Sequence, residues 1–240
     1  MNNKLYIVGM GPGDPELVTR KAERILRDSS LVAYFTKKGE TSHAYRIAST
    51  FLLHKPEALK FEYPITTEKP HTGSEYQTAM QFFYDDCAEQ LSDALQRGLS
   101  PALLCEGDPM LYGSAIYLFD RLNAHYPIEI IPGISAMSGC WSNAKLPIVR
   151  KDQALDVIPA TLPIESLTER LKRCDAAVIM KIGRNLEKIK SALKAVGLFE
   201  RAFYIERGTQ IQQQIMALSA LESCKAPYFS LILIPGRAKP

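Results

Sequence analysis

Residues 8–15 read VGMGPGDP and begin with the last residue of the apolar run at 5–8. A short apolar run that ends in a glycine-rich turn is typical of a buried strand leading into a helix. Asp14 is suited to cap that helix, and Pro15 to occupy its first position. A second apolar run at 31–35 follows residues at helical spacing. The order strand, loop, helix, strand predicts parallel strands joined by a helical crossover.

The same alternation continues to the end of the chain. We expect further strands at 102–105, 128–131, 156–158, 176–180, 202–205, 213–218 and 228–234, and helices at 74–97, 165–173 and 185–196. The pattern starts again after 146, which predicts an N-terminal domain, 1–146, and a C-terminal domain, 147–240. Each is expected to be α/β, with a mixed, mostly parallel sheet flanked by helices. Several prolines interrupt 54–75, which predicts a loop or a mobile flap.

Composition narrows the function classes. The 240 residues are 46% hydrophobic and 23% charged, which is ordinary for a globular protein. The net charge of +3 is too small to indicate a nucleic-acid partner. Apolar runs stay well below the roughly 20 residues of a membrane span, and the first residues do not resemble a signal peptide. We therefore expect a cytoplasmic protein without a membrane or nucleic-acid partner.

Cysteine and histidine spacing gives no indication of a metal site. The five cysteines include no Cys-x-x-Cys pair, and the four histidines are scattered along the chain. Structural and catalytic zinc sites need ligands at short, characteristic spacings. The sequence therefore predicts neither a protein-bound metal nor a disulfide framework.

The glycine-rich loop at 9–13 matches known nucleotide-binding turns only in part. A dinucleotide fingerprint needs a third glycine where Asp14 stands, and Pro12 removes a backbone donor. No Gly-Lys-Ser/Thr follows, as a phosphate-binding P-loop requires. The loop suits close approach of a ligand other than a phosphate, which disfavours a nicotinamide oxidoreductase. A plain strand-to-helix turn remains the alternative.

Later loops also lie at the carboxyl ends of expected strands, where open α/β sheets bind ligands. In the loop at 106–113, Asp108 either accepts hydrogen bonds from a ligand or caps the next helix. In the loop at 132–136, Ser135 has the same two possible roles. Met180 either packs on a flat aromatic ring or belongs to the core of the second half.

In this order, the loops resemble those of the tetrapyrrole methyltransferases, two-domain α/β enzymes that use S-adenosylmethionine (SAM). The motifs at 8–15, 106–109 and 132–136 carry the resemblance, which extends over 6–234. It implies a tetrapyrrole substrate, and SAM bound in a cleft between the two halves. It also assigns the cofactor contacts to Pro12, Glu106, Gly107, Asp108, Leu111, Ser135, Ala136, Met180 and Gly208.

Within the family, the segments 106–112, 157–161 and 228–231 are most similar to enzymes that methylate carbon 20 of precorrin-2 to give precorrin-3A in cobalamin biosynthesis. The same reaction on cobalt-factor II, or methylation of another ring carbon, is an alternative. Gly113 departs from this group, whose members often have a hydroxyl residue there. Diphthine synthase and a non-catalytic tetrapyrrole carrier are more distant alternatives. The resemblance also implies a homodimer.

Methyl transfer from SAM needs in-line positioning of two bound molecules, which can supply roughly 7–11 kcal/mol. The sequence accordingly contains no evident nucleophile–base pair. We predict no single catalytic residue, and keep Tyr112, Glu106 and Asp108 as candidates for moving a proton. The carboxylates of a tetrapyrrole need cations, which we expect from Lys181, Arg184 and Arg46. Four more cations lie in or beside predicted loops: Lys37, Lys38, Arg150 and Arg207. For every one of these seven cations, a solvated surface position is the alternative.

Overall fold

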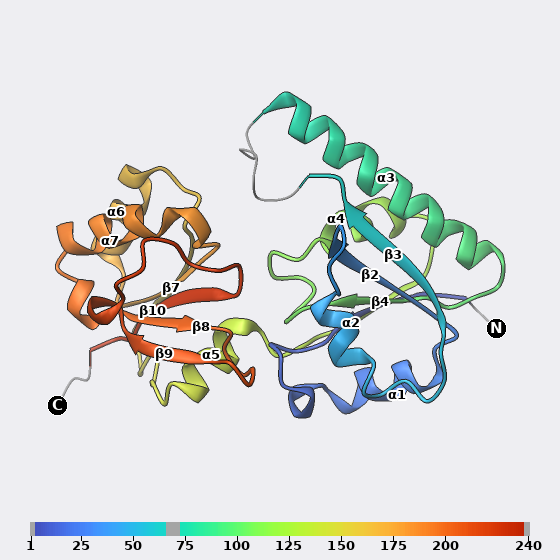
Figure 1. Ribbon diagram of the computed structural model, residues 1–240, viewed down its shortest axis with the longest axis horizontal. Helices are drawn as coiled ribbons and strands as arrows, with labels where there is room; N and C mark the ends of the chain where they lie inside the picture. The colour runs from blue at the N-terminus through green and yellow to red at the C-terminus, as the bar shows by residue number, and fades with distance from the viewer. Residues whose placement is uncertain (1–2, 66–72, 238–240) are drawn as a thin grey trace. The chain divides into compact units, whose positions relative to one another are not determined.

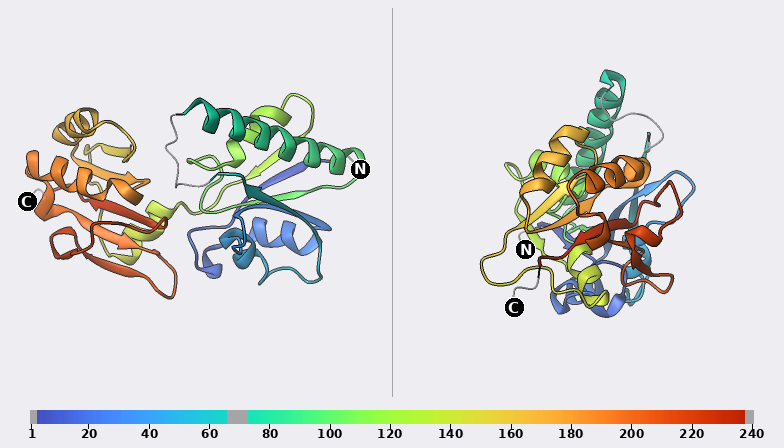
Figure 2. Two further views of the ribbon diagram at one scale, coloured as in Figure 1. Left: turned by 45° about the horizontal axis from the view of Figure 1, so that its top comes forward. Right: turned by 90° about the vertical axis from the view of Figure 1, so that its left-hand side faces the viewer.

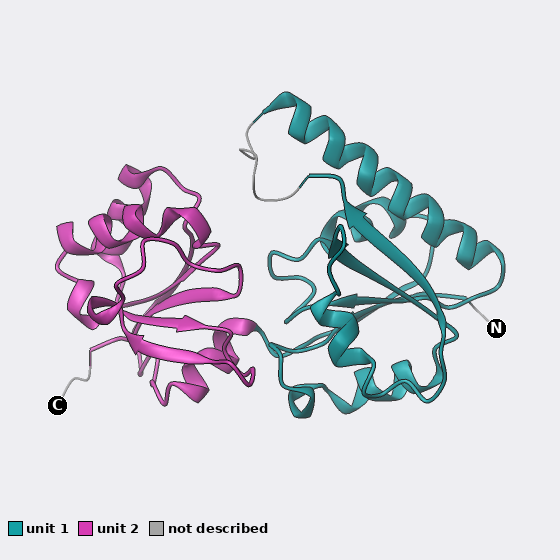
Figure 3. Ribbon diagram, viewed as in Figure 1, with its two compact units in different colours: residues 1–135 teal, residues 136–240 magenta. Residues whose placement is uncertain are grey.

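The computed structural model describes residues 3–65 and 73–237. Within it the chain divides into two compact units, 1–135 and 136–240 (Figure 3). The sequence placed the domain boundary later, at 146/147. Residues of α5 (Ala136–Asn143) and the segment after it pack on the second sheet, so they group with the second unit.

The first unit contains a wholly parallel sheet in the order β3-β2-β4-β1-β5 (Figure 1). Its strands are β1 (Leu5–Gly9), β2 (Leu31–Lys37), β3 (Glu57–Tyr63), β4 (Ala102–Cys105) and β5 (Ile128–Ile131). Its helices are α1 (Arg20–Asp28), α2 (His43–Ala48), α3 (Ser74–Gln96) and α4 (Ala115–Leu122). After β1 the chain forms β2 and β3 toward one edge of the sheet, and after β4 it passes β1 to form β5 at the opposite edge. This change of direction marks the edge at which open α/β sheets bind ligands.

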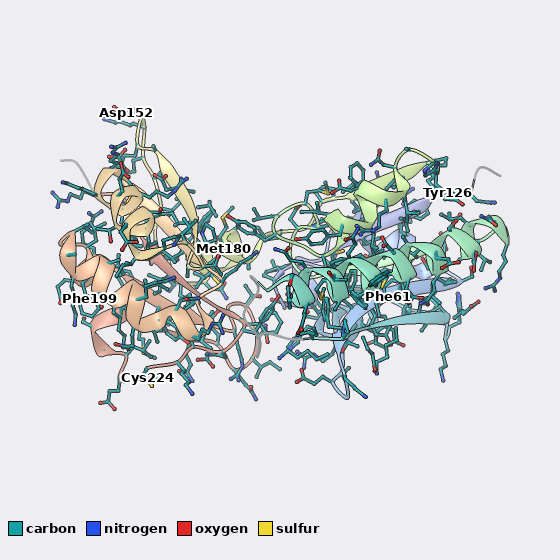
Figure 4. The ribbon with its side chains drawn as sticks, turned by 90° about the horizontal axis from the view of Figure 1, so that it is seen from above. Phe61, Tyr126, Asp152, Met180, Phe199 and Cys224 are labelled. Atoms are coloured by element: carbon teal, nitrogen blue, oxygen red, sulfur yellow. The ribbon has the colours of Figure 1, made fainter. Side chains whose placement is uncertain are left out.

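Alternating side chains give this sheet two buried faces. Leu5 and Ile7 of β1 pack with α3 and α4, whereas Val8 packs with α1 and α2 on the opposite face. Figure 2 shows the helices on both sides of the sheet, with α3 running along its length. Phe61 of β3 is buried against α3 (Figure 4). Burial on both faces explains why the strands appear in the sequence as continuous apolar runs.

The second unit has a mixed sheet in the order β6-β7-β10-β8-β9. Its strands are β6 (Leu155–Pro159), β7 (Ala176–Met180), β8 (Phe203–Glu206), β9 (Gln214–Ala217) and β10 (Ser230–Ile234). Helices α6 (Ile164–Arg173) and α7 (Leu186–Ala195) cover one face, and α5 the other. Short 3-10 turns lie at Pro15–Leu17 in the first unit, and at Gly183–Asn185, Phe199–Arg201 and Leu218–Ala220 in the second.

The α/β architecture is confirmed, and strand direction distinguishes the two sheets. The expectation of mostly parallel strands describes the first sheet, whereas in the second only β6 and β7 form a parallel pair. Helices α6 and α7 return the chain so that β6, β7 and β8 run in the same direction. Strand β9 follows β8 without an intervening α-helix and pairs with it antiparallel. The segment 218–229, which contains only a short 3-10 turn, then returns the chain so that β10 runs in the same direction as β9. Strand β10 then inserts between β7 and β8.

One local expectation was wrong, and another was confirmed for a shorter helix than expected. The segment 54–75 is not one loop, because β3 pairs with β2 from Leu31 opposite Glu57 onward. Its apolar residues alternate, but the flanking prolines obscured that signal; residues 66–72 lie outside the described part. Asp14 is an N-cap and Pro15 is the first residue of a helix, as expected, but that helix is the short 3-10 turn Pro15–Leu17. The Asp14 carboxylate accepts a hydrogen bond from the Glu16 N–H, and α1 begins later, with Thr19 as its cap.

Candidate functional site

The loops that follow β1, β4 and β5 meet at the carboxyl edge of the first sheet. Gly11 and Gly107 form an isolated antiparallel bridge, in which the Gly107 N–H donates to the Gly11 carbonyl at 2.8 Å. The Met10 N–H donates to the Cys105 carbonyl at 2.8 Å. These hydrogen bonds continue the pairing of β1 and β4 into their loops. The first and second motifs of the sequence are therefore held together by backbone contacts.

Glycines bring the third loop against the other two. A Cβ atom on Gly9 would lie 2.5 Å from the Gly133 nitrogen and 2.8 Å from the Gly107 carbonyl oxygen. A Cβ atom on Gly133 would collide with the same oxygen and lie 3.0 Å from the Gly9 Cα. The sequence interpretation assigned such small residues to close approach of a ligand. In the structure, Gly9, Gly107 and Gly133 allow the three loops to approach one another.

Asp108 connects the second loop to the third. One carboxylate oxygen, Oδ1, accepts a hydrogen bond from the Met110 N–H at 2.9 Å, and Oδ2 accepts one from the Gly133 N–H at 3.2 Å. The alternative that Asp108 caps the next helix is wrong, because the N-cap position of α4 is Ser114. Each carboxylate oxygen has a further lone pair. A contact between Asp108 and a cofactor stays a prediction.

Glu106 and Arg46 place two charges beside these loops. Burial raises the pKa of Glu106 to about 7, and the nearby Arg46 guanidinium acts in the opposite direction. Part of the Glu106 side chain is nevertheless exposed, so its carboxyl group lies among protein atoms without being closed off from solvent. Arg46, on α2, also contacts the Nδ1 atom of His43 at 2.7 Å. The fold thus brings together Glu106, a predicted cofactor residue, and Arg46, a predicted substrate residue.

The rest of the second loop has an unusual backbone. Tyr112 has a φ of 58° and a side chain that is 42% exposed. A Cβ atom on the next residue, Gly113, would lie 2.7 Å from the Pro109 carbonyl oxygen. This explains why glycine rather than a hydroxyl residue stands at 113 in this chain. Of the other predicted cofactor residues in this unit, Pro12, Leu111 and Ser135 are half-buried in the same three loops.

A hydroxyl cluster beside this loop was missed by sequence reasoning. The Ser114 hydroxyl shares a hydrogen bond with Tyr63 at 2.7 Å and accepts one from Tyr84 at 3.2 Å. These residues come from β3, α3 and the start of α4, and together they fix the end of the second loop. The serine directly after Gly113 was the available signal, whereas the tyrosines lie far away in sequence.

In the second unit, three predicted cofactor residues lie on one side of the sheet. Ala136 and Met180 (Figure 4) pack against the hydrophobic cluster that includes Cys140. Any side chain at Gly208 would collide with the Cys140 Sγ. Close packing against Cys140 therefore explains why a glycine stands at 208. A contact between Gly208 and a cofactor stays a prediction.

Two predicted substrate cations follow β7. Lys181 comes directly after the strand with a φ of 58°, and Arg184 lies in the 3-10 turn Gly183–Asn185. Both residues are exposed overall. Neighbouring protein atoms partly desolvate the Lys181 amino group, which lowers its pKa. Arg46 belongs to the first unit. Residues 3–65 and 73–237 contain no group of three or more His, Cys, Asp or Glu side chains arranged to hold a metal ion. Within those same ranges, no helix is long and apolar enough to cross a membrane.

Comparison with known proteins matches this arrangement to one family. The family model for tetrapyrrole (corrin/porphyrin) methylases matches residues 4–222. The chain is 45% identical to a precorrin-2 C(20)-methyltransferase from Sinorhizobium sp, over 97% of this chain and 95% of the relative. It is 29% identical to the cobalt-precorrin-2 C(20)-methyltransferase of Salmonella typhimurium, over 98% of this chain and 97% of the relative. It is also 40% identical to the cobalamin biosynthesis protein CobIJ of Mycobacterium tuberculosis, but spans only 46% of that longer protein.

Solved structures show the same fold. The cobalamin biosynthetic enzyme cobalt precorrin-4 methyltransferase, CbiF, has a TM-score of 0.74 at 20% identity, covering 97% of this chain and 94% of that one. Uroporphyrin-III C-methyl transferase from Thermus thermophilus, complexed with S-adenyl homocysteine, has a TM-score of 0.66 at 20% identity, covering 96% and 97%. At these identities the likeness concerns the fold.

Proposed function

Because the chain belongs to the tetrapyrrole (corrin/porphyrin) methylase family, we propose that it transfers a methyl group from SAM to carbon 20 of precorrin-2 and forms precorrin-3A. The observation that carries this proposal is the 45% identity to a precorrin-2 C(20)-methyltransferase over 97% of the chain. The relative that acts on the cobalt form is less similar, at 29% identity. We therefore take the metal-free macrocycle as substrate, and cobalt-factor II as the alternative.

The first unit supports the choice of cofactor. SAM supplies an electrophilic methyl group on a sulfonium ion. The residues of this chain proposed to hold it are Pro12, Glu106, Gly107, Asp108, Leu111 and Ser135, which the structure gathers at the carboxyl edge of one sheet. Backbone hydrogen bonds and close glycine contacts fix these loops to one another, so a ligand meets a surface already in place. A solved relative of this fold was crystallised with S-adenyl homocysteine.

We assign a further part of the cofactor site to Ala136, Met180 and Gly208 of the second unit. Met180 is half-buried at the end of β7, where a flexible thioether suits contact with a flat ring. Lys181, Arg184 and Arg46 are proposed to bind carboxylates of the tetrapyrrole. The support is their exposed positive charge next to the proposed cofactor residues Met180 and Glu106.

Positioning supplies most of the proposed catalysis. Bringing carbon 20 in line with the methyl group needs two oriented ligands and no protein nucleophile. Of the candidates for moving a proton, Glu106 is the best suited, because a carboxyl group with a pKa of about 7 exchanges protons readily near neutral pH. Asp108 already accepts two backbone hydrogen bonds, which favours a positioning role for it. We further propose a cytoplasmic homodimer, which size-exclusion chromatography with light scattering and cell fractionation would test.

Anaerobic incubation with methyl-labelled SAM tests the reaction. We expect label on carbon 20 of precorrin-2, and little or no transfer to cobalt-factor II. Mass spectrometry gives the stoichiometry, and nuclear magnetic resonance gives the labelled position. Label at another ring carbon would refute the regiochemistry, and faster transfer to the cobalt form would reverse the choice of substrate. Calorimetric titration with SAM and NADH separately tests the cofactor.

A further inference from the structure

A fixed arginine lies at the carboxyl end of β8. Glu206, the last residue of that strand, accepts a hydrogen bond from the Tyr204 hydroxyl on Oε2 at 3.0 Å. Its Oε1 atom pairs with a terminal guanidinium nitrogen of Arg207 at 3.1 Å. Tyr204 is fully buried, the Glu206 side chain is 14% exposed, and the Arg207 side chain is 38% exposed. One carboxylate thus links a buried hydroxyl to a cation at the surface.

The backbone of this loop is also constrained. Arg207 has a φ of 48° and Thr209 a φ of 67°, in the left-handed region that non-glycine residues seldom occupy. The Arg207 N–H donates to the Phe229 carbonyl at 2.7 Å, and the Thr209 N–H to the Gln213 Oε1 at 2.7 Å. Such conformations persist only where surrounding contacts enforce them, and they are found preferentially at ligand sites. These contacts fix the backbone at Arg207, and the ion pair with Glu206 directs its guanidinium.

The position of Arg207 relates it to Lys181. Strands β7 and β8 run in the same direction with β10 between them, so both cations follow carboxyl ends at one edge of the second sheet. Two strand spacings separate these ends by about 10 Å. Lys181 also has a left-handed φ, of 58°. Glu206 engages one terminal nitrogen of Arg207, whereas a guanidinium carries five N–H donors in a planar fork that matches a carboxylate.

We propose that Arg207, oriented by Glu206 and Tyr204, binds a carboxylate of the tetrapyrrole and forms with Lys181 a carboxylate-binding subsite on the second unit. The inference rests on the proposed function, because it takes the tetrapyrrole polycarboxylate as the ligand. It adds one substrate-binding residue, Arg207, and two positioning residues, Glu206 and Tyr204. The direct contact is assigned to Arg207, and Glu206 acts through it.

Paired substitutions separate charge from backbone conformation. Arg207→Gly removes the cation and also relieves the left-handed backbone strain, whereas Arg207→Ala removes the same charge and keeps a Cβ atom at the same positive φ. We expect both to raise the KM for precorrin-2 about tenfold or more, equivalent to about 1.4 kcal/mol, with unchanged SAM affinity. Neither variant should lower the melting temperature appreciably, because alanine keeps the backbone strain of the wild-type residue and glycine relieves it. Glu206→Gln should raise KM by about threefold, because the guanidinium loses its fixed orientation.

The matched control is Arg173→Ala, which removes another exposed arginine from the second unit. Arg173 pairs with Glu169 on α6 at 2.8 Å, and its side chain is 79% exposed. Its KM should stay within about twofold of the wild-type value. A folded Arg207→Gly protein with the wild-type KM would overturn the inference and leave the proposed function intact. Equal weakening of SAM and tetrapyrrole binding in that variant would have the same meaning. Failure of the wild-type protein to methylate precorrin-2 would instead overturn the proposed function, and with it this subsite.

Discussion

Replacing Gly133 by alanine tests whether the close packing of the three loops supports the site. The new Cβ would collide with the Gly107 carbonyl oxygen and lie 3.0 Å from the Gly9 Cα. Carbon and oxygen atoms in contact normally stay about 3.3 Å or more apart, and both neighbours here are backbone, so the loops must separate. Overpacking of this kind costs about 1–3 kcal/mol. Weakening the hydrogen bond from the Gly133 N–H to Asp108 adds about 1 kcal/mol, for a total of about 2–4 kcal/mol.

Urea unfolding followed by circular dichroism measures this loss, and calorimetry measures SAM affinity. We expect the Gly133→Ala protein to be less stable by that amount and to bind SAM at least about tenfold more weakly. The control is Gly73→Ala, because Gly73 has a φ of −78° and no atom within 4 Å of an added Cβ. It should stay within about 1 kcal/mol of the wild-type protein. Equal stability of the two variants would refute the packing argument.

Three further predictions concern single side chains. Asp108→Ala should lower the free energy of unfolding by about 1–3 kcal/mol, because two backbone N–H groups lose their acceptor. The same variant should bind SAM more weakly in calorimetry, and an unchanged SAM affinity would contradict the role assigned to Asp108. The raised pKa of Glu106 means that folding disfavours its ionised form. The wild-type protein should therefore lose stability relative to Glu106→Gln as pH rises from about 4.5 to about 7, and the difference should stay constant above that range. Parallel pH profiles of the two proteins in urea unfolding would refute this. Lys181→Ala should raise the KM for precorrin-2 and leave the SAM affinity nearly unchanged. The control variant Lys172→Ala, on α6, should change neither quantity. Equal weakening of SAM and precorrin-2 binding in the Lys181 variant would rule out a substrate contact.

Apolar runs bounded by glycine and proline were sufficient to predict most of the fold. Strands such as β4 and β7 are buried on both faces, so their sequences are continuously apolar and easily recognised. The exceptions have physical causes. Strand β3 lies at a sheet edge, and its alternating pattern is weaker than the proline signals around it. The direction of β10 depends on pairing with distant strands, which local periodicity does not encode.

The candidate site was predictable to a similar extent. Motif order located the three loops, because ligand-binding loops follow the carboxyl ends of strands. The role of each residue depended on contacts across the fold. Gly9 and Gly133 are far apart in sequence but touch, and Gly208 is required by Cys140 on α5. The partners of Ser114 come from β3 and α3, and no spacing in the sequence indicates them.

The place where the two units join has a consequence for dissecting the protein. The division between Ser135 and Ala136 falls inside the third motif, 132–136. Gly133 is tied to Asp108 in the first unit, and Ala136 begins α5 on the second sheet. The covalent tether between the units is thus itself a proposed ligand-binding segment. Cutting the chain at its natural boundary would split that segment, so the separately expressed halves should not recover SAM binding when mixed, even if each folds.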